Sequence, residues 1–287
     1  MFVVTIVGTS ALSVRDAALA SETCGSDNLN WIQEGRAVDL ICQTDEPRHL
    51  RDRLEDALPH ADIFVQRQDT RARRLFVADM DSTMITVECI DELADYAGLK
   101  AEVAAVTEAA MRGELDFEGA LRERVALLKG LAESSITDCL NMRVKHSSGA
   151  KQLIAGLKAA GIRTVLVSGG FTAFAEPVGQ ALGFDRVVAN VLQRQDGELT
   201  GLTEGPIVDA ARKLTVLDEE CFALGITRSE AIAIGDGAND LLMVEAAGLG
   251  IAYHAKPALA KAADARIRNG DLSTVLYAVG LGAGAAN

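Results

Sequence analysis

Aromatic residues, proline and cysteine are all scarce in this sequence: aromatics make up 4% of its 287 positions, and there are five prolines and five cysteines. The cysteine number is odd and no two are spaced like a pair of metal ligands, so we interpret them as reduced thiols of a cytoplasmic protein. No apolar run reaches the roughly 18 residues that a membrane-spanning helix needs. The apolar N-terminal stretch has no preceding lysine or arginine, and its β-branched residues predict a strand rather than a signal peptide.

Positive charge is also in short supply. The chain has 28 lysines and arginines against 41 aspartates and glutamates, which gives a formal net charge of −13. Nucleic acids and anionic membranes bind surfaces with an excess of lysine and arginine, so we expect neither as a partner. A small phosphorylated substrate is still compatible with this balance, because it needs only local positive charge or a metal ion.

Residues 1–70 have the pattern of a small α+β domain. The strands and helices predicted there, in chain order, are 2–8, 11–22, 30–33, 37–43, 47–58 and 61–66. The order β-α-β-β-α-β is typical of a ferredoxin-like domain. The polar, arginine-rich segment 66–74 is interpreted as a linker to the rest of the chain.

From Leu75 the pattern changes to short, continuous apolar runs, each separated from the next by enough residues for a helix. The runs are 75–79, 164–168, 186–190, 231–236 and 249–253. Continuous runs indicate strands that are buried on both faces, which is typical of a parallel sheet covered by helices. Residues 86–150 predict helices alone. We therefore expect an α/β domain over 71–287, with a Rossmann-like parallel sheet and a helical cap inserted at about 86–150.

Polar motifs follow three of these predicted strands. DMDST begins at Asp79, SGGF begins at Ser168, and GDGAND contains Asp236. The carboxyl ends of parallel strands lie at one edge of a sheet, where open α/β sheets bind ligands, so we expect the motifs to meet. Carboxylates gathered there can hold a hard divalent cation, or can divide into a nucleophile and a general acid. Each motif taken alone could also be a helix cap or a tight turn.

Together these motifs resemble a known superfamily. A lysine is needed to neutralise phosphate beside carboxylates, and Lys213 is the candidate, although Arg212 competes with it. DMDST, SGGF, Lys213 and GDGAND, in this order, resemble the haloacid dehalogenase superfamily of aspartate-nucleophile phosphatases. TVECIDELA, which contains Glu88, and the segment 111–131 resemble the cap of its phosphoserine phosphatases. The N-terminal domain is similar, in topology alone, to the ACT-type leader of some members.

The resemblance implies that the chain removes phosphate from O-phospho-L-serine, the last step of L-serine biosynthesis, through an aspartyl-phosphate. Asp79 would be the nucleophile, and Asp81 would act as general acid and then as general base. Asp79, Asp236 and the backbone carbonyl of Asp81 would ligate Mg²⁺. Ser168 and the amide of Gly169 would hold phosphate oxygens.

Three further residues would support this reaction. Lys213 would stabilise the phosphate charge, Asn239 would contact the phosphoryl group, and Asp240 would position Lys213 or a metal-bound water.

Another small-metabolite phosphatase or a phosphotransferase would use the same motifs, and a non-catalytic metabolite sensor is a more distant alternative. A homodimer joined through the edge of the N-terminal sheet is also expected.

Substrate choice would lie in the cap. Glu88 suits the ammonium group of phosphoserine, and Arg124 suits its carboxylate through a bidentate contact. Met111 and Phe117 would form the apolar cover of the site. Ordinary structural roles are open to the charged pair, since Glu88 could stabilise a helix N-terminus and Arg124 could extend to water beside an apolar stripe.

Overall fold

The N-terminal part of the chain folds as a β-α-β-β-α-β unit, the element order that the sequence predicts. Its elements are β1 (Phe2–Gly8), α1 (Val14–Cys24), β2 (Leu29–Gln33), β3 (Ala37–Cys42), α2 (Pro47–Ala57) and β4 (Ala61–Arg67). Ser13 and Asp16 form a capping box at the start of α1, and Pro47 occupies the first turn of α2. Leu50 and Leu54 of α2 pack on the sheet in a core of their own. The ACT-like assignment of this unit stays a prediction.

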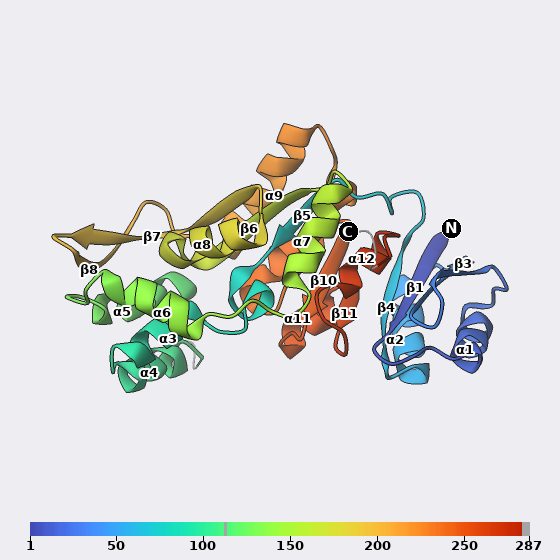
Figure 1. Ribbon diagram of the computed structural model, residues 1–287, viewed down its shortest axis with the longest axis horizontal. Coiled ribbons are helices and arrows are strands. Elements are labelled where there is room, and N and C mark those ends of the chain that lie inside the picture. The colour runs from blue at the N-terminus through green and yellow to red at the C-terminus, as the bar shows by residue number, and fades with distance from the viewer. Residues whose placement is uncertain (112–113, 283–287) are drawn as a thin grey trace.

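The computed structural model describes residues 1–111 and 114–282. Beyond the N-terminal unit, the chain forms an α/β core with a helical cap (Figure 1). The core strands are β5 (Leu75–Ala78), β6 (Arg163–Phe171), β7 (Arg186–Gln195), β8 (Glu198–Glu204), β9 (Ala231–Gly235), β10 (Leu249–Tyr253) and β11 (Ala265–Ile267). The core helices are α7 (Ala150–Ala159), α8 (Thr172–Leu182), α9 (Ala210–Leu224), α10 (Leu241–Ala246), α11 (Pro257–Ala262) and α12 (Thr274–Ala278). The five apolar runs thus coincide with β5, β6, β7, β9 and β10.

Helices cover both faces of the core sheet. Phe76 and Ala78 of β5 pack on the side of α7, α8 and α12, whereas Leu75 and Val77 pack on the side of α9, α10 and α11. Both sides of this short strand are therefore buried, which explains its continuous apolar sequence. β5 pairs in parallel with β6 and β9, β6 pairs in parallel with β7, and β10 lies parallel between β9 and β11. The expected Rossmann-like parallel sheet is confirmed.

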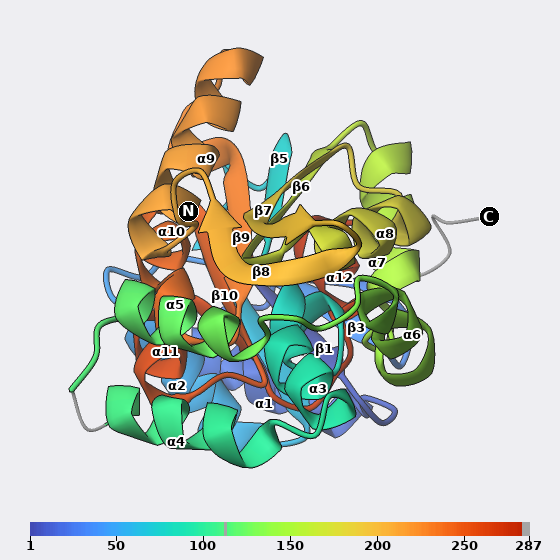
Figure 2. The same cartoon turned by 90° about the vertical axis from the view of Figure 1, so that its left-hand side faces the viewer.

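The cap consists of α3 (Cys89–Tyr96), α4 (Lys100–Met111), α5 (Phe117–Leu127) and α6 (Ser134–Arg143). The cap packs against a hairpin that the sequence analysis did not predict. This hairpin is formed by β7 and the antiparallel β8. Figure 2 shows α5 beneath this hairpin, and the backbone N–H of Gly130 donates to the carbonyl of Leu199 at 2.8 Å. The cap is therefore hydrogen-bonded to an extension of the core sheet as well as covalently joined to the core.

The two parts of the chain share one sheet. β4 pairs with β11 through Ile63 and Arg266, which gives eleven strands among the described residues in the order β2-β3-β1-β4-β11-β10-β9-β5-β6-β7-β8. The buried carboxylate of Asp62 accepts hydrogen bonds from the backbone N–H groups of Arg268, Asn269 and Gly270 at 2.9, 3.1 and 2.7 Å. The domain boundary expected near residue 70 stays a prediction, but the contact across it is extensive.

The segment expected to be a simple linker contributes to this contact. Arg71 forms an ion pair with Asp39 at 2.6 Å and donates to the carbonyls of Tyr277 and Ala278 at 3.1 Å each. Arg73 is 4% exposed and donates to the side chain of Gln66 at 2.8 Å. The arginines of this segment therefore contribute to the contact between the two parts of the chain, and its interpretation as a linker stays a prediction.

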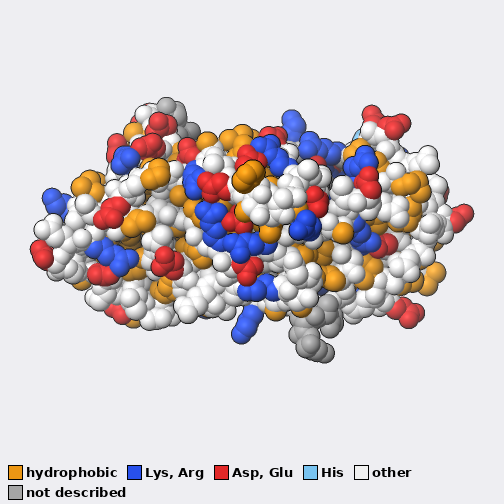
Figure 3. Space-filling model, turned by 90° about the horizontal axis from the view of Figure 1, so that it is seen from above, with side chains coloured by type: hydrophobic (Ala, Val, Ile, Leu, Met, Phe, Trp, Pro, Cys, Tyr) orange, Lys and Arg blue, Asp and Glu red, His pale blue; other side chains and the backbone are white. Residues whose placement is uncertain are grey.

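The surface mixes charges of both signs in spite of the net charge of −13. Seen from above, lysine and arginine side chains gather near the middle of the molecule, among acidic side chains (Figure 3). In the described part of the chain, no helix combines the length and the apolar character required to cross a membrane.

Candidate active site

The sequence motifs meet at the carboxyl ends of three adjacent strands. Asp79 directly follows β5, Ser168 lies in β6, and Asp236 directly follows β9. Lys213 reaches the same place from α9, where its Nζ donates to the carboxylate of Asp79 and, at 2.7 Å, to that of Asp240. The structure thus brings residues from four distant segments into one buried cluster.

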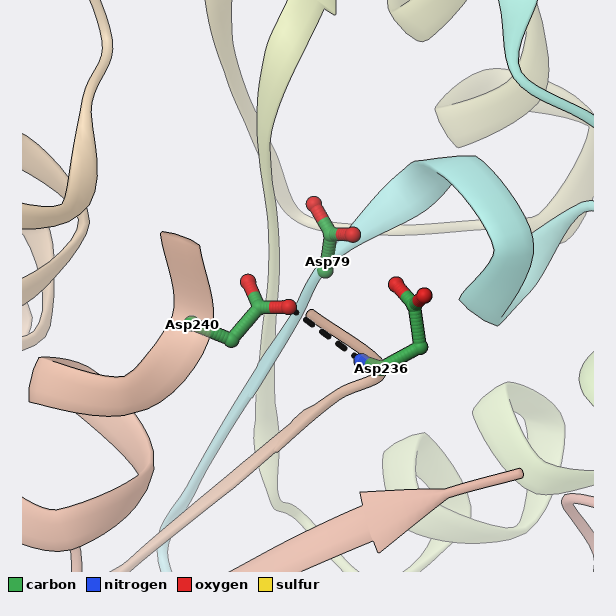
Figure 4. A group of neighbouring side chains, drawn as sticks. All are labelled: Asp79, Asp236 and Asp240. Atoms are coloured by element: carbon green, nitrogen blue, oxygen red, sulfur yellow. Dashed lines mark hydrogen bonds between the residues drawn. The ribbon is translucent and has the colours of Figure 1, made fainter. Parts of the chain in front are cut away.

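Three carboxylates form the centre of this cluster. One oxygen each from Asp79, Asp236 and Asp240 lies within 4.8 Å of the others (Figure 4). Both oxygens of Asp240 accept hydrogen bonds: one accepts from Lys213, and the other accepts from the backbone N–H groups of Asp236 and Gly237 at 3.2 and 3.0 Å. Asp79 accepts from Lys213 through Oδ1, so its Oδ2 can still bind another ligand. The side chain of Asp236 is nearly buried, and the Nζ atom of Lys256 lies 3.9 Å from its carboxylate.

This donor set fits a hard divalent cation. Magnesium-type ions prefer carboxylate oxygens and keep several waters, so few protein ligands suffice. Asp79 and Asp236 can supply the oxygens, whereas Asp240, both of whose oxygens accept hydrogen bonds, is better placed to hold Lys213 and the backbone after β9.

The charges of the cluster are strongly coupled. Burial and then the neighbouring Asp240 raise the pKa of Asp79 well above its ordinary value, and the same two causes raise the pKa of Asp236 to about 6. Burial alone would lower the pKa of Lys213, but Asp79 and Asp240 raise it above its ordinary value. The neighbouring carboxylates therefore favour the charged form of the lysine, and a cation bound beside Asp79 and Asp236 would likewise favour the charged forms of these two groups.

Asp81 has hydrogen-bond partners different from those of these three carboxylates. Its Oδ1 accepts the backbone N–H of Cys89 at 2.8 Å, and its Oδ2 accepts the hydroxyl of Ser168 at 3.2 Å. Burial and the charge of Glu88 raise the pKa of Asp81 to about 6. A carboxyl group with this pKa can both give and take a proton near neutral pH. A Cβ added to Gly170 would lie 2.7 Å from Asp81 Oδ2, so glycine leaves the room that this carboxyl occupies.

A cavity of about 430 Å³ separates the cluster from the cap. The predicted residues that line it are Asp79, Asp81, Glu88, Phe117, Arg124, Gly169, Asp236 and Asn239. Ser168, Lys213 and Asp240 lie behind its wall and are fully buried. Among these predicted residues, the core contributes carboxylates and the cap contributes Glu88 and Arg124, which have opposite charges.

Glu88 and Arg124 are the charged cap residues of the prediction. Glu88 directly precedes α3, and its Oε1 accepts the hydroxyl of Ser82 at 2.7 Å. Arg124 lies on α5, and its Nε donates to the carbonyl of Ala120 at 3.3 Å. Both residues line the cavity, so both could contact a ligand bound there.

Phe117 covers the glycine segment from the cap side. Its Cζ lies 3.1 Å from the position that a Cβ on Gly169 would take, so a side chain at that position would require the ring to shift by a few tenths of an ångström. Met111, the other predicted cover residue, ends α4, and its side chain lies outside the part of the chain that the structure describes.

Sequence analysis missed several residues around the cavity. The additional lining residues are Thr107, Leu115, Asp116, Gly170, Ala238 and Lys256. Behind the wall, Asn190 hydrogen-bonds to the carbonyl of Gly169 at 2.8 Å. Asn190 closes the apolar run RVVAN, so the criterion that selected Asp79, a polar residue at the end of a buried strand, could have found it.

Comparisons with known proteins agree with this geometry. The family model for haloacid dehalogenase-like hydrolases matches residues 76–245. A phosphoserine phosphatase from Albidiferax ferrireducens is 49% identical over 208 residues, which cover 71% of this chain and 88% of that protein.

Solved structures give the same result. A probable phosphoserine phosphatase from Vibrio cholerae superposes with a TM-score of 0.80 at 33% identity, and covers 99% of this chain and 86% of that one. A substrate-bound phosphoserine phosphatase complex superposes with a TM-score of 0.67 at 39% identity, over 71% of this chain and 97% of that one. The similarity to the Vibrio protein thus includes the N-terminal unit.

Proposed function

Since this chain belongs to the haloacid dehalogenase-like hydrolases and, within them, to the phosphoserine phosphatases, we propose that it hydrolyses O-phospho-L-serine to L-serine and phosphate, the last step of L-serine biosynthesis. One observation carries this proposal: the ammonium group of Lys213 is bonded to Asp79, and Asp81 provides a second carboxyl group at the same cavity. A nucleophile, a proton donor and a positive charge at one site are what cleavage of a phosphomonoester requires.

The reaction would proceed in two steps. The carboxylate of Asp79 attacks phosphorus, the bond from phosphorus to the serine oxygen breaks, and Asp81 gives its proton to that oxygen. Asp81, now a carboxylate, removes a proton from water, and the resulting hydroxide attacks phosphorus of the aspartyl-phosphate. Phosphate leaves, and Asp79 is free again. The raised pKa of Asp81 suits both of its roles.

Other residues would hold the phosphoryl group. Ser168 and the N–H of Gly169 would bind its oxygens, Lys213 would balance its charge, and Asn239 would contact it from the far side of the cavity. Asp240 would keep Lys213 in place, as its hydrogen bond to Nζ suggests.

A divalent cation belongs to this proposal, and Mg²⁺ is the ion that we propose. Asp79, Asp236 and the backbone carbonyl of Asp81 would hold it, and its charge would reduce the repulsion between the phosphate dianion and the attacking carboxylate.

The cap would select the substrate. Glu88 would bind the ammonium group of phosphoserine and Arg124 its carboxylate, with Phe117 and Met111 as an apolar cover that excludes water during the first step. A different small phosphomonoester, or transfer of the phosphoryl group to an alcohol, would use the same core residues. Reaction products from a panel of phosphorylated amino acids, with and without an alcohol acceptor, distinguish these alternatives.

The central test is phosphate release from phosphoserine in the presence of Mg²⁺. We expect wild type and the surface variant Asp69→Asn to release phosphate, and we expect EDTA or Asp79→Asn to reduce release to background. Asp69 is an exposed residue that pairs with Arg67, so its variant controls for loss of one negative charge. Undiminished turnover by Asp79→Asn would refute the assignment of the nucleophile. A protein that binds phosphoserine and releases no phosphate would be a sensor.

Substrate choice is tested with two arginines of the same helix. Arg124→Ala should lower kcat/KM for phosphoserine by about 10- to 100-fold relative to an aryl phosphate, because a charge-assisted hydrogen bond is lost. Arg122→Ala should leave this ratio unchanged, since Arg122 is exposed and pairs with Glu118 on the surface. Equal ratios for both variants would exclude Arg124 from recognition.

We also propose a cytoplasmic location and a homodimer. All five cysteines are free, as expected in a reducing compartment. β2 is an edge strand of the sheet, and an exposed edge can pair with a second copy. Light scattering coupled to size-exclusion chromatography measures the mass, and a mass near 30.3 kDa would show a monomer.

A further inference from the structure

The segment that would bind phosphate is a bulge in β6. Val167 pairs with Val188, and the next pair is Phe171 with Asn190, so four steps along β6 correspond to two along β7. Residues 168–170 therefore leave the regular ladder of the sheet. Their backbone groups can then face a ligand, but a carbonyl in such a bulge needs another partner for its hydrogen bond.

Asn190 supplies this partner and also holds a second segment. Its Nδ2 donates to the carbonyl of Gly169 at 2.8 Å, and its Oδ1 accepts the backbone N–H of Val208 at 2.8 Å. The side chain is 1% exposed, so water cannot easily replace either bond. Because one neighbour is an acceptor and the other a donor, a single orientation of the amide satisfies both.

The second segment leads to the buried lysine. Val208 is followed by Asp209, the N-cap residue of α9, whose carbonyl accepts the backbone N–H of Lys213 at 3.0 Å. The carbonyl of Val208 also lies 3.5 Å from the position that a Cβ on Gly169 would occupy. One amide group thus sets the distance between the bulge and the start of the helix that carries Lys213.

We propose that Asn190 is a positioning residue for phosphate. Its bond to the carbonyl of Gly169 holds the peptide between Gly169 and Gly170 against the start of the helix that carries Lys213. The backbone of the bulge and the ammonium of Lys213 are thereby fixed relative to one another, so that both reach the same phosphoryl group. Both polar atoms of the Asn190 side chain are bonded to backbone groups, so Asn190 itself is expected to touch neither substrate nor metal. This inference rests on the proposed function of the site.

Two variants test the role without removing the volume of the side chain. Asn190→Leu has a similar size and no hydrogen bonds, and Asn190→Asp keeps an acceptor for Val208 but cannot donate to Gly169 when ionised. Gln193→Ala is the matched control, because Gln193 lies on the same strand and bonds within the hairpin, to Thr200 at 2.8 Å.

The measurements are the inhibition constant of inorganic phosphate and kcat and KM for phosphoserine, all with Mg²⁺. Displaced binding groups weaken phosphate binding, so both Asn190 variants should raise the inhibition constant about 10-fold and lower kcat/KM about 10- to 100-fold. Gln193→Ala should match wild type. Inhibition constants and KM do not depend on how much of a preparation is folded, so a purely structural role would change only the apparent kcat.

Two results would separate the possible failures. If wild type releases phosphate from phosphoserine, and the inhibition constant of either Asn190 variant stays within about twofold of wild type, the positioning role is refuted while the proposed function stands. If wild type releases none, the proposed function itself fails. A raised constant in Asn190→Asp alone would point to the added charge, and would likewise refute positioning by the amide.

Discussion

Replacing Lys213 with methionine probes the charge balance of the site most directly. Lys213 is fully buried, and its Nζ donates to both Asp79 and Asp240, which are also buried. Methionine preserves much of the side-chain length and apolar packing but removes the charge. Two neighbouring carboxylates would then face each other without this cation.

The expected loss of stability is large. Removing one member of a buried ion pair costs about 3–5 kcal/mol, because the remaining charge is left uncompensated. Lys213 pairs with two carboxylates, so we expect a loss near the upper end of this range, about 4–5 kcal/mol, in the free energy of unfolding. Adding Asp240→Asn to Lys213→Met removes one of the orphaned charges, and should recover about 1–3 kcal/mol through the coupling of the two positions.

Urea unfolding followed by circular dichroism at pH 7.5 measures these values. EDTA is included so that no divalent cation takes the place of the lysine. Lys100→Met is the control, because Lys100 is exposed and its pair with Asp95 at 3.4 Å should contribute less than about 1 kcal/mol. A loss below about 1.5 kcal/mol for Lys213→Met would refute the reasoning, since a buried pair would then be worth no more than a surface pair.

Three other predictions concern acid stability, the space around Asp81 and the contact between the two parts of the chain. Burial raises the pKa of Glu220, but hydrogen bonds from Arg163 and Arg186 outweigh this and hold the pKa below its ordinary value. Its stabilising effect should therefore be full above pH 4.5 and disappear as the pH falls through the folded-state pKa. Glu220→Gln should lose about 2 kcal/mol at pH 7 and show a flatter decline below pH 5 in urea midpoints; an unchanged pH profile would contradict this. Gly170→Ala places a methyl group against Asp81 and should lower kcat about 100-fold with a melting temperature within a few degrees of wild type, whereas normal turnover would show that the carboxyl can move. Arg71→Met should cost about 2–4 kcal/mol in urea unfolding, and Arg67→Met, which breaks an exposed pair, less than about 1 kcal/mol; equal losses would show that the Arg71 contacts are weak.

The parallel sheet was predictable because its strands are covered on both sides. The run LFVA at 75–78 is apolar at every position, since alternate side chains enter two different cores. The polar residues that follow such runs indicated the site. A polar residue at the end of a buried strand needs a hydrogen-bond partner or a ligand. Convergence of the motifs followed from the geometry of parallel strands.

The hairpin formed by β7 and β8 was missed although its turn is visible in the sequence. Asp196 and Gly197 have φ angles of 53° and 83°, and the flanking residues Gln195 and Glu198 pair with each other. An Asp-Gly pair between two extended segments is a strong signal for such a two-residue turn. The paired part of the hairpin, residues 191–204, lies beyond the apolar run 186–190, so a search for hydrophobic runs could not detect it.

The contacts of Arg71 and Arg73 could not be predicted from local sequence. A segment with four arginines in nine residues has the composition of a solvated connection. Its partners include the backbone carbonyls of Tyr277 and Ala278, which are about 200 positions away in the chain. Hydrogen bonds to distant backbone groups leave no trace in composition or periodicity, so only the folded structure reveals them.

The strand pair that joins β4 to β11 has a consequence for synthesis of the protein on the ribosome. β4 is complete after residue 67 and pairs with β1, but the partner of its other edge is made only when residues 265–267 emerge. For most of translation the nascent N-terminal unit presents an open strand, which could recruit the wrong partner. Asp62 protects it: a carboxylate that must be buried is satisfied by the N–H groups of residues 268–270, and an incorrect strand that lacked such donors would bury an uncompensated charge. Asp62 thus stabilises the contact in the folded protein and also disfavours incorrect pairing at the open edge of β4 during synthesis.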